Sequence, residues 1–193
     1  MMGQREASLE VSAQNVQGFD AGKYHAVITL CASCAGHLKH SYPGLLKGTE
    51  NEFAANVFAK KVMNFSEFLS KNFDLKPEDF NPTSDKVCYH SPCHMRNNGI
   101  VDEPRELLKM AATYTPAVEE DTCCGFGGTF SIKFPELASE MGRKKIENGE
   151  ASGADVMITD CPGCVMQLRG VATAKDSALK VEHMAELLAR TMK

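Results

Sequence analysis

The chain contains two copies of one unusual pattern, a short apolar run followed at once by two cysteines with two residues between them. AVITLCASCAGHLK starts at Ala26, and VMITDCPGCVMQLR starts at Val156. Self-similarity of this kind indicates a duplicated structural unit. Each copy predicts a strand that ends in a CxxC turn and continues into a helix. We therefore expect an α/β fold of two pseudo-repeated β–CxxC–α halves, in three layers with mainly parallel sheets.

The two predicted halves are joined by a polar segment. Residues 76–85 (KPEDFNPTSD) carry two prolines and several turn-forming residues, which is typical of a connector. This places the first half over 1–75 and the second over 86–193. Only the second half has a pair of adjacent cysteines upstream of its CxxC turn. We therefore expect a fragment with a truncated first half, in which only the second site is complete.

The spacing of apolar residues predicts the main elements of both halves. The predicted helices cover 6–17, 50–73, a stretch from Pro104, 134–148 and 183–192. The predicted strands cover 24–30, 86–90, 115–119, 154–159 and 179–182. We expect the first of these strands to be buried on both faces, the phenylalanines of 50–73 to lie in the core, and Leu137 to lie on the apolar face of its helix, opposite a charged face. His183 is expected to act in the core or as a helix cap.

The segment Asp121–Gly128 (DTCCGFGG) places two adjacent cysteines directly before three glycines. Adjacent cysteines rarely bridge each other, because a disulfide between neighbours distorts the peptide, so this pair favours two thiolates at one metal centre. Glycine lets the backbone come close to a bulky inorganic group. Five thiols exceed the four ligands of tetrahedral zinc, and their number suits an iron–sulfur cluster. The five are Cys93, Cys123, Cys124, Cys161 and Cys164. The glycines expected to shape this site are Gly125, Gly127 and Gly163.

The chain has eight cysteines, and without a signal peptide the default environment is a reducing one. There, paired cysteines more often bind metal or do redox chemistry than form structural disulfides. In each repeat the helix N-terminus that follows should lower the pKa of the CxxC thiols. Cys31 and Cys34 would form a second, incomplete site. Cys88 is expected to be a buried apolar residue without a chemical role.

Composition narrows the possible partners. The net charge is −4 and no Lys/Arg run is present, so we expect no nucleic-acid partner. No apolar stretch approaches the ~18 residues that a membrane-spanning helix needs. We expect a cytoplasmic protein without direct membrane insertion, so any membrane association would go through a partner.

These motifs resemble those of the cysteine-rich CCG domain family. The resemblance rests on YHSPCHMRNN, CCGFGGTFSIKFPE, ADVMITDCPGC and KVEHMAELL, and it covers most of 24–190. The family includes the heterodisulfide reductase B subunit, the glycolate oxidase iron–sulfur subunit, the anaerobic glycerol-3-phosphate dehydrogenase C subunit and lactate-utilisation protein A. The resemblance implies a cubane or non-cubane 4Fe–4S cluster held by the five cysteines named above. It also implies two pseudo-equivalent α/β halves with cluster sites near their interface.

The resemblance further implies an electron-transfer subunit, or a fragment of one, in a lactate- or glycolate-type 2-hydroxyacid oxidoreductase. The substrate would be oxidised by a flavin-containing dehydrogenase subunit, and other iron–sulfur subunits would be further partners. GFGG lacks the GxGxxG spacing of a dinucleotide site, so the chain itself shows no flavin or nicotinamide motif. The chain would thus be one subunit of an oxidoreductase complex.

Two other functions stay open. In the first, the cluster reduces a disulfide, as in heterodisulfide reductase, with His90 and His94 as candidate proton donors in a catalytic step. These histidines could equally be turn residues without a chemical role. In the second, four of the five cysteines form a structural zinc module, and zinc could also replace iron during aerobic expression.

Overall fold

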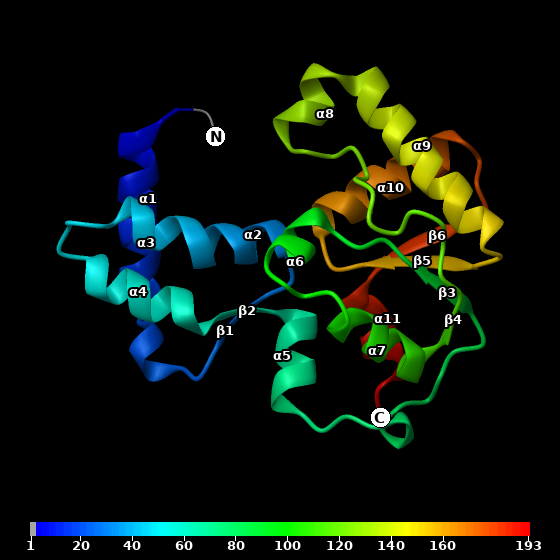
Figure 1. The fold of residues 1–193 in the computed structure, drawn as a ribbon, viewed down its shortest axis with the longest axis horizontal. Coiled ribbons are helices and arrows are strands. Elements are labelled where there is room, and N and C mark those ends of the chain that lie inside the picture. Colours follow the sequence, from blue (N-terminus) through cyan, green and yellow to red (C-terminus); the bar gives the residue numbers. More distant parts are fainter. Residues whose placement is uncertain (1–2) are drawn as a thin grey trace. The chain divides into compact units, whose positions relative to one another are not determined.

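A computed structural model describes residues 3–193 of the chain (Figure 1). The described part divides into two compact units. The first unit holds the residues up to Thr29 together with Ser33–Asn64. The second holds Leu30–Ala32 together with Phe65–Lys193. Helix α5 (Phe65–Asn72), which falls within the predicted first half, therefore belongs to the second unit.

The remaining helices are α1 (Arg5–Phe19), α2 (Ala32–Gly36), α3 (Tyr42–Leu45), α4 (Glu52–Lys61), α6 (Cys93–Asn97), α7 (Glu103–Ala111), α8 (Thr129–Lys133), α9 (Pro135–Ala151), α10 (Pro162–Ala174) and α11 (Met184–Thr191). Helical turns of other kinds are η1 (Ala21–Lys23), the π-helical η2 (His37–Ser41) and η3 (Pro77–Asp79). The strands are β1 (Val27–Thr29), β2 (Val62–Asn64), β3 (Lys86–Tyr89), β4 (Thr113–Tyr114), β5 (Val156–Thr159) and β6 (Lys180–His183). Within residues 3–193, every helix is too short or too polar to cross a lipid bilayer.

The second unit is built on a four-stranded parallel sheet in the order β4-β3-β5-β6. Val87 pairs with Val156, and Thr159 pairs with His183. Because all four strands run in the same direction, their carboxyl ends meet at one edge. In open α/β sheets that edge is where ligands bind.

Alternate residues of the central strands enter two different cores. Val87, Tyr89 and Ile158 pack with α7 and α11 on one face. Cys88 and Met157 pack with α9 and α10 on the other. Figure 1 shows these two helix pairs on opposite sides of the strands. The second unit is thus a three-layer α/β/α structure, which confirms the predicted fold class.

The first unit is smaller and has a two-stranded parallel sheet of β1 and β2. Its core gathers Val16 of α1, Tyr42 of α3, and Ala55 and Phe58 of α4. Tyr42 and Phe58 stack with their ring centroids 6.0 Å apart. Strand β1 of this unit and strand β5 of the second unit are each followed by a CxxC segment.

The predicted single helix over 50–73 is wrong. The strand β2 interrupts it and separates α4 from α5, because Val62 is buried and pairs with Val27 of β1. The phenylalanines of this stretch are also not all in the core, since Phe53 is 80% exposed whereas Phe58 is buried. Strand β1 is not buried on both faces either. It has a single neighbouring strand, and Ile28 is 45% exposed.

Other predicted elements are present with shifted bounds or faces. The strand predicted over 115–119 lies earlier, as β4, where it pairs with Lys86 and Val87. Leu137 does not point inward and is largely exposed on α9. His183 caps α11, and its Nδ1 accepts a hydrogen bond from the N–H of Ala185 at 3.1 Å, so the predicted capping role is confirmed.

Candidate thiol-rich metal centre

Two neighbouring strands deliver the chemistry-bearing residues to the carboxyl edge of the second unit's sheet. β3 is followed by His90 and Cys93, and β5 is followed by Asp160 and Cys161. The backbone N–H of His90 donates to the carbonyl oxygen of Ile158 at 2.9 Å, which continues the ladder past the end of β3. Parallel pairing therefore holds these two turns side by side.

Three buried thiols lie together at this edge. Cys124, Cys161 and Cys164 are 2%, 6% and 7% exposed. The Sγ atoms of Cys124 and Cys164 are 3.2 Å apart, and the Cys164 thiol is close enough to Cys161 to lower its pKa. Residues that are distant in the sequence thus present their sulfur atoms to one place.

Mutual hydrogen bonding separates the pKa values of these thiols. The pKa of Cys161 is lowered to about 2, first by the Cys164 thiol and then by the Cys31 thiol, with backbone N–H groups of α10 adding to the effect. The Cys123 and Cys164 thiols lower the pKa of Cys124. In turn, Cys124 is the largest cause of the raised pKa values of Cys123 and Cys164. For Cys164, the Cys161 thiol is the next cause. Two of these thiols, Cys124 and Cys161, therefore favour the thiolate, the form of cysteine that binds metals.

The other two predicted thiols extend this group toward solvent. Cys123 is exposed and Cys93 is partly so. Cys93 is close enough to Cys123 to contribute to its raised pKa, after the larger effects of Cys124 and of burial. The Sγ of Cys93 lies 3.6 Å from Nδ1 of His94, whose side chain is exposed. The structure thus gathers Cys124, Cys161 and Cys164 as buried thiols, and Cys123 and Cys93 lie toward the surface beside them.

Glycines shape the turn that follows the adjacent cysteines. Gly125 has φ +88°, and a Cβ there would collide with the carbonyl oxygen of Ala138. Gly127 also has a positive φ of +50°. At Gly163 a Cβ would lie 2.7 Å from the ring of Phe126, so this close contact requires glycine.

The segment before Cys123 is held by buried charged groups. Nζ of Lys145 donates to the carbonyl oxygens of Glu119 and Glu120 at 2.6 and 3.1 Å. The guanidinium of Arg105 binds the carboxylate of Glu120 at 3.0 and 3.2 Å. The N–H of Ser91, in the turn after β3, donates to the carbonyl oxygen of Glu120 at 3.1 Å. These contacts tie the cysteine loop to the turn that carries His90.

His90 lies among the thiols and is 1% exposed. The ligand atoms of His90, Cys124 and Cys164 are all within 4.8 Å of one another. Among residues 3–193, neither ring nitrogen of His90 finds a hydrogen-bond partner, and the same holds for the hydroxyl groups of Ser91 and Thr159. Buried polar atoms are normally paired, so this set fits a site built to hold a metal group. Burial lowers the pKa of His90, which favours the neutral imidazole that metals bind.

Cys31 and Cys34, expected to form one incomplete site, fall in different units. Cys31 belongs to the second unit, where its thiol contacts that of Cys161, and Cys34 belongs to the first. Cys88 is fully buried in the core, and burial raises the pKa of its thiol to about 12. Cys88 is therefore the inert residue that its apolar surroundings predict.

Sequence reasoning missed a buried polar network directly behind Cys161. The carboxylate of Asp160 accepts hydrogen bonds from the hydroxyl of Tyr89, at 2.8 Å, and from the hydroxyl of Ser66. Asp160 is fully buried. The only sequence signal was an acidic residue directly after an apolar strand, where the first repeat has leucine.

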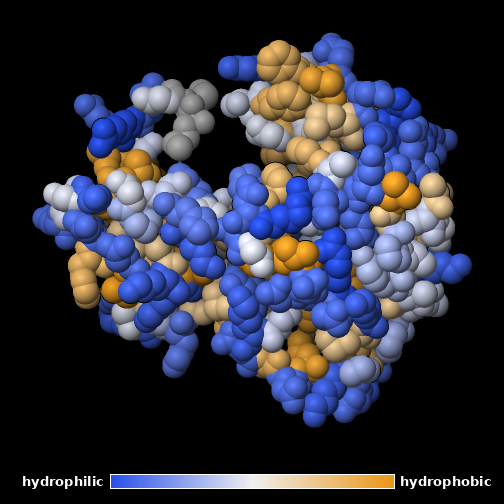
Figure 2. All heavy atoms as spheres, in the orientation of Figure 1, coloured by the Kyte–Doolittle hydropathy of each residue, from blue (hydrophilic) through white to orange (hydrophobic). Residues whose placement is uncertain are grey.

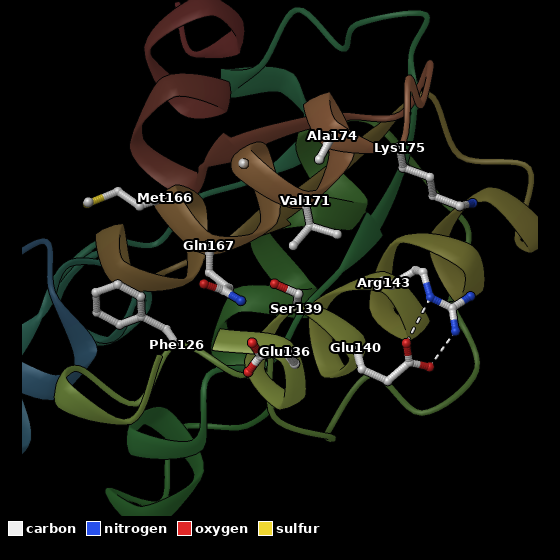
Figure 3. A pocket seen from close by; sticks show the side chains of 11 residues that line it. Phe126, Glu136, Ser139, Glu140, Arg143, Met166, Gln167, Val171, Ala174 and Lys175 are labelled. Carbon is white, nitrogen blue, oxygen red and sulfur yellow. Dashed lines mark hydrogen bonds and ion pairs between the residues drawn. The ribbon is translucent and has the colours of Figure 1, made fainter. Parts of the chain in front are cut away.

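A separate cavity of about 630 Å³ lies between α9 and α10 (Figure 3). Phe126 and Met166 border it near the cysteine turn, and Arg143 and Glu140 form an ion pair at its rim. Beyond it, Ile132, Phe134 and Leu137 are exposed, and Figure 2 shows apolar atoms gathered over α8. No cysteine is among the described residues that line this cavity, so it is distinct from the thiol centre.

Comparison with known proteins identifies sequence relatives of the whole chain. A model of a cysteine-rich domain family, CCG, matches residues 1–39 and 87–169. Lactate utilization protein A of Bacillus licheniformis is 36% identical over 180 residues, which cover 90% of this chain and 73% of that protein.

Two further relatives show similar coverage. Lactate utilization protein A of a Geobacillus species is 35% identical over 185 residues, covering 93% of this chain and 75% of that protein. Lactate utilization protein A 2 of Bacillus cereus is 30% identical over 194 residues, covering 97% of this chain and 78% of that protein.

Proposed function

Because the chain belongs to the cysteine-rich CCG domain family, we propose that it is an iron–sulfur subunit of a system that oxidises lactate or a related 2-hydroxyacid. The chain's role in this proposal is electron transfer from a flavin-containing partner. The support for a lactate-type system is the similarity to proteins named for lactate utilization over most of the chain.

One observation carries the proposal. Three buried thiols share the carboxyl edge of one sheet with His90, whose ring nitrogens have no hydrogen-bond partner among the described residues. Cysteines that served only for packing would not need to place two sulfur atoms 3.2 Å apart beside a buried imidazole whose nitrogens lack partners among the described residues. The soft sulfur donors are the ligand type that iron–sulfur clusters and zinc select.

The proposed cluster ligands are Cys93, Cys123, Cys124, Cys161 and Cys164. When bound, a 4Fe–4S cluster supplies one-electron transfer. The chain's own residues hold the thiolates in place, exclude water from the buried side, and direct backbone N–H groups of α10 toward the Cys161 sulfur. N–H groups that face sulfur and burial from solvent are two factors that set a cluster's potential.

The partner completes the proposal. No dinucleotide fingerprint occurs in the sequence, so the flavin would come from another chain, a dehydrogenase subunit, with further iron–sulfur subunits in the same complex. As part of this proposal the complex works in the cytoplasm, where thiols stay reduced.

The test is anaerobic purification of the full chain together with its native partners. We expect a brown complex whose visible absorption bleaches when lactate is added and returns on reoxidation. Electron paramagnetic resonance should show a cluster signal that changes with the same cycle. A complex whose visible and paramagnetic spectra do not respond to lactate or to dithionite would contradict electron transfer through this chain.

Zinc is the second candidate because His90, Cys124 and Cys164 are compact enough for tetrahedral coordination. With Cys161 they offer the Cys3His ligand set of many structural zinc sites. Zinc and iron are separated by counting both metals in protein made without oxygen. One zinc per chain with neither iron nor sulfide would establish the structural module.

A third candidate, disulfide reduction, draws on the contact between Cys93 and the exposed His94. Both lie at the surface end of the thiol group, where a substrate could approach. Turnover of a thiol–disulfide substrate by the isolated chain would favour this function. The electron-transfer proposal expects none.

A further inference from the structure

We infer that Cys31 is a ligand of the same centre as Cys161. This inference rests on the proposed function, since it adds a sixth thiol to the proposed ligand set. It changes the expectation for Cys31 and Cys34, which sequence spacing alone would treat as one unit.

Backbone contacts on both sides of Cys31 fix it at the centre. The carbonyl oxygen of Leu30 accepts a hydrogen bond from Nε2 of His183 at 2.7 Å. The N–H of Ala32 donates to the carbonyl oxygen of Asp160 at 3.3 Å. His183 is the last paired residue of β6, and Asp160 follows the last paired residue of β5. Both lie at the carboxyl edge of the sheet, so Cys31 is held at that edge.

Packing supports the same placement. Ala32 is fully buried in the core cluster that also contains Cys124, Cys161 and Cys164. The segment Leu30–Ala32 belongs to the second unit although the residues before and after it belong to the first. The packing of this segment therefore holds the Cys31 side chain at the thiol centre.

The Cys31 thiol also has a suitable partner. Cys31 and Cys164 are both close enough to Cys161 to lower the pKa of its thiol, and the Cys164 sulfur lies 3.2 Å from that of Cys124. These four thiols form a continuous series beside the unpaired nitrogens of His90. Four thiolates is the number that a 4Fe–4S cubane takes, and Cys31 brings this series to four.

The test compares Cys31→Ser with Cys34→Ser in the full chain purified without oxygen. If Cys31 is a ligand and Cys34 is not, only Cys31→Ser should alter the paramagnetic spectrum and the midpoint potential. Only Cys31→Ser should also release iron to a chelator faster, by at least ~10-fold, the lower end of the effect expected for a disturbed metal site. Two residues of one separate site would instead respond alike.

A metal-free measurement tests the adjacency directly. Metal-stripped Cys34→Ser protein is treated with dibromobimane, which links neighbouring thiols, and is then digested with trypsin. We expect a link between peptide 24–39, which then holds Cys31 alone, and peptide 146–169, which holds Cys161 and Cys164.

The outcomes separate the two proposals. Wild-type protein without iron would overturn the proposed function. Wild-type protein with a cluster, combined with a Cys31→Ser spectrum identical to wild type, would overturn the role of Cys31 alone. The absence of the 24–39 to 146–169 link would also count against Cys31, whatever metal the protein holds.

Discussion

His183 donates a hydrogen bond from Nε2 to the carbonyl oxygen of Leu30, with 2.7 Å between the two atoms. Its Nδ1 accepts from the N–H of Ala185, so the proton resides on Nε2. One imidazole thereby caps α11 and fixes the segment that carries Cys31.

Replacing His183 should remove both contacts. His183→Ala is expected to lower the free energy of unfolding by about 1–3 kcal/mol, because it deletes a helix cap and removes the hydrogen bond to the Leu30 carbonyl. His183→Asn keeps an N-cap acceptor but is too short to reach Leu30, so it should recover about 1 kcal/mol. Urea unfolding measures both variants. Equal stability of His183→Ala and wild type would show that neither contact matters.

Gly125→Ala should damage the cysteine turn. The backbone there has φ +88°, and the new methyl group would meet the carbonyl of Ala138 and lie 3.0 Å from the Cβ of Met141. We expect a loss of about 2–4 kcal/mol from backbone strain and overpacking, together with lost metal. Gly153→Ala is the matched control, since φ is +72° there but no atom lies within 4 Å. It should cost only about 1–2 kcal/mol and keep the metal. Identical thermal unfolding of the two variants would contradict the close contact at Gly125.

Asp160→Asn should destabilise the core behind Cys161. An asparagine side chain has one oxygen, so its two terminal atoms cannot both accept hydrogen bonds from the hydroxyls of Tyr89 and Ser66. One buried hydroxyl therefore loses its acceptor. The expected cost is about 2–3 kcal/mol by calorimetry, whereas Tyr89→Phe, which removes one hydroxyl, should cost about 1–2 kcal/mol. If Asp160→Asn unfolded at the wild-type temperature, the hydrogen bonds of the Asp160 carboxylate would not contribute to the stability of the fold.

The contact between Asp85 and Arg190 predicts a pH dependence. The Thr83 hydroxyl and the Arg190 guanidinium, each 3.0 Å from Oδ2, lower the pKa of Asp85 from 3.8. A carboxyl with a lowered folded-state pKa stabilises the protein above its unfolded pKa and loses that contribution as the pH falls through the folded value. Because both side chains are about one-third exposed, Asp85→Asn should cost only about 0.5–1 kcal/mol at pH 7. The difference from wild type should vanish near pH ~2–3, and a gap that persists there would refute the electrostatic origin.

Local patterns predicted the elements that carry the site. The run Val156–Thr159 is apolar, ends in a CxxC turn and leads into α10, and the structure has this strand and helix at those positions. The parallel α/β architecture followed from the repeat of that unit. These features depend on residues that are close together in the sequence, so local patterns are sufficient to predict them.

The features that were missed depend on distant partners. Strand β2 lies within a run that has helical spacing, and only its pairing with β1 makes it a strand. His90 was considered as a proton donor or a turn residue and not as a metal ligand, because its position among the sulfur atoms follows from the pairing of β3 with β5. Cys31 looked like the partner of Cys34 because the contacts of Leu30 and Ala32 with the far end of the chain leave no trace in local spacing.

The most direct measurement is the amount of iron and acid-labile sulfide per chain in protein purified without oxygen, for wild type, Cys124→Ser and Cys88→Ala. A shared thiol centre predicts about four of each in wild type, a large loss in Cys124→Ser, and wild-type amounts in Cys88→Ala, whose buried thiol is not among the proposed ligands. Iron and sulfide that stay unchanged in Cys124→Ser, or that are absent from the wild-type protein, would contradict it.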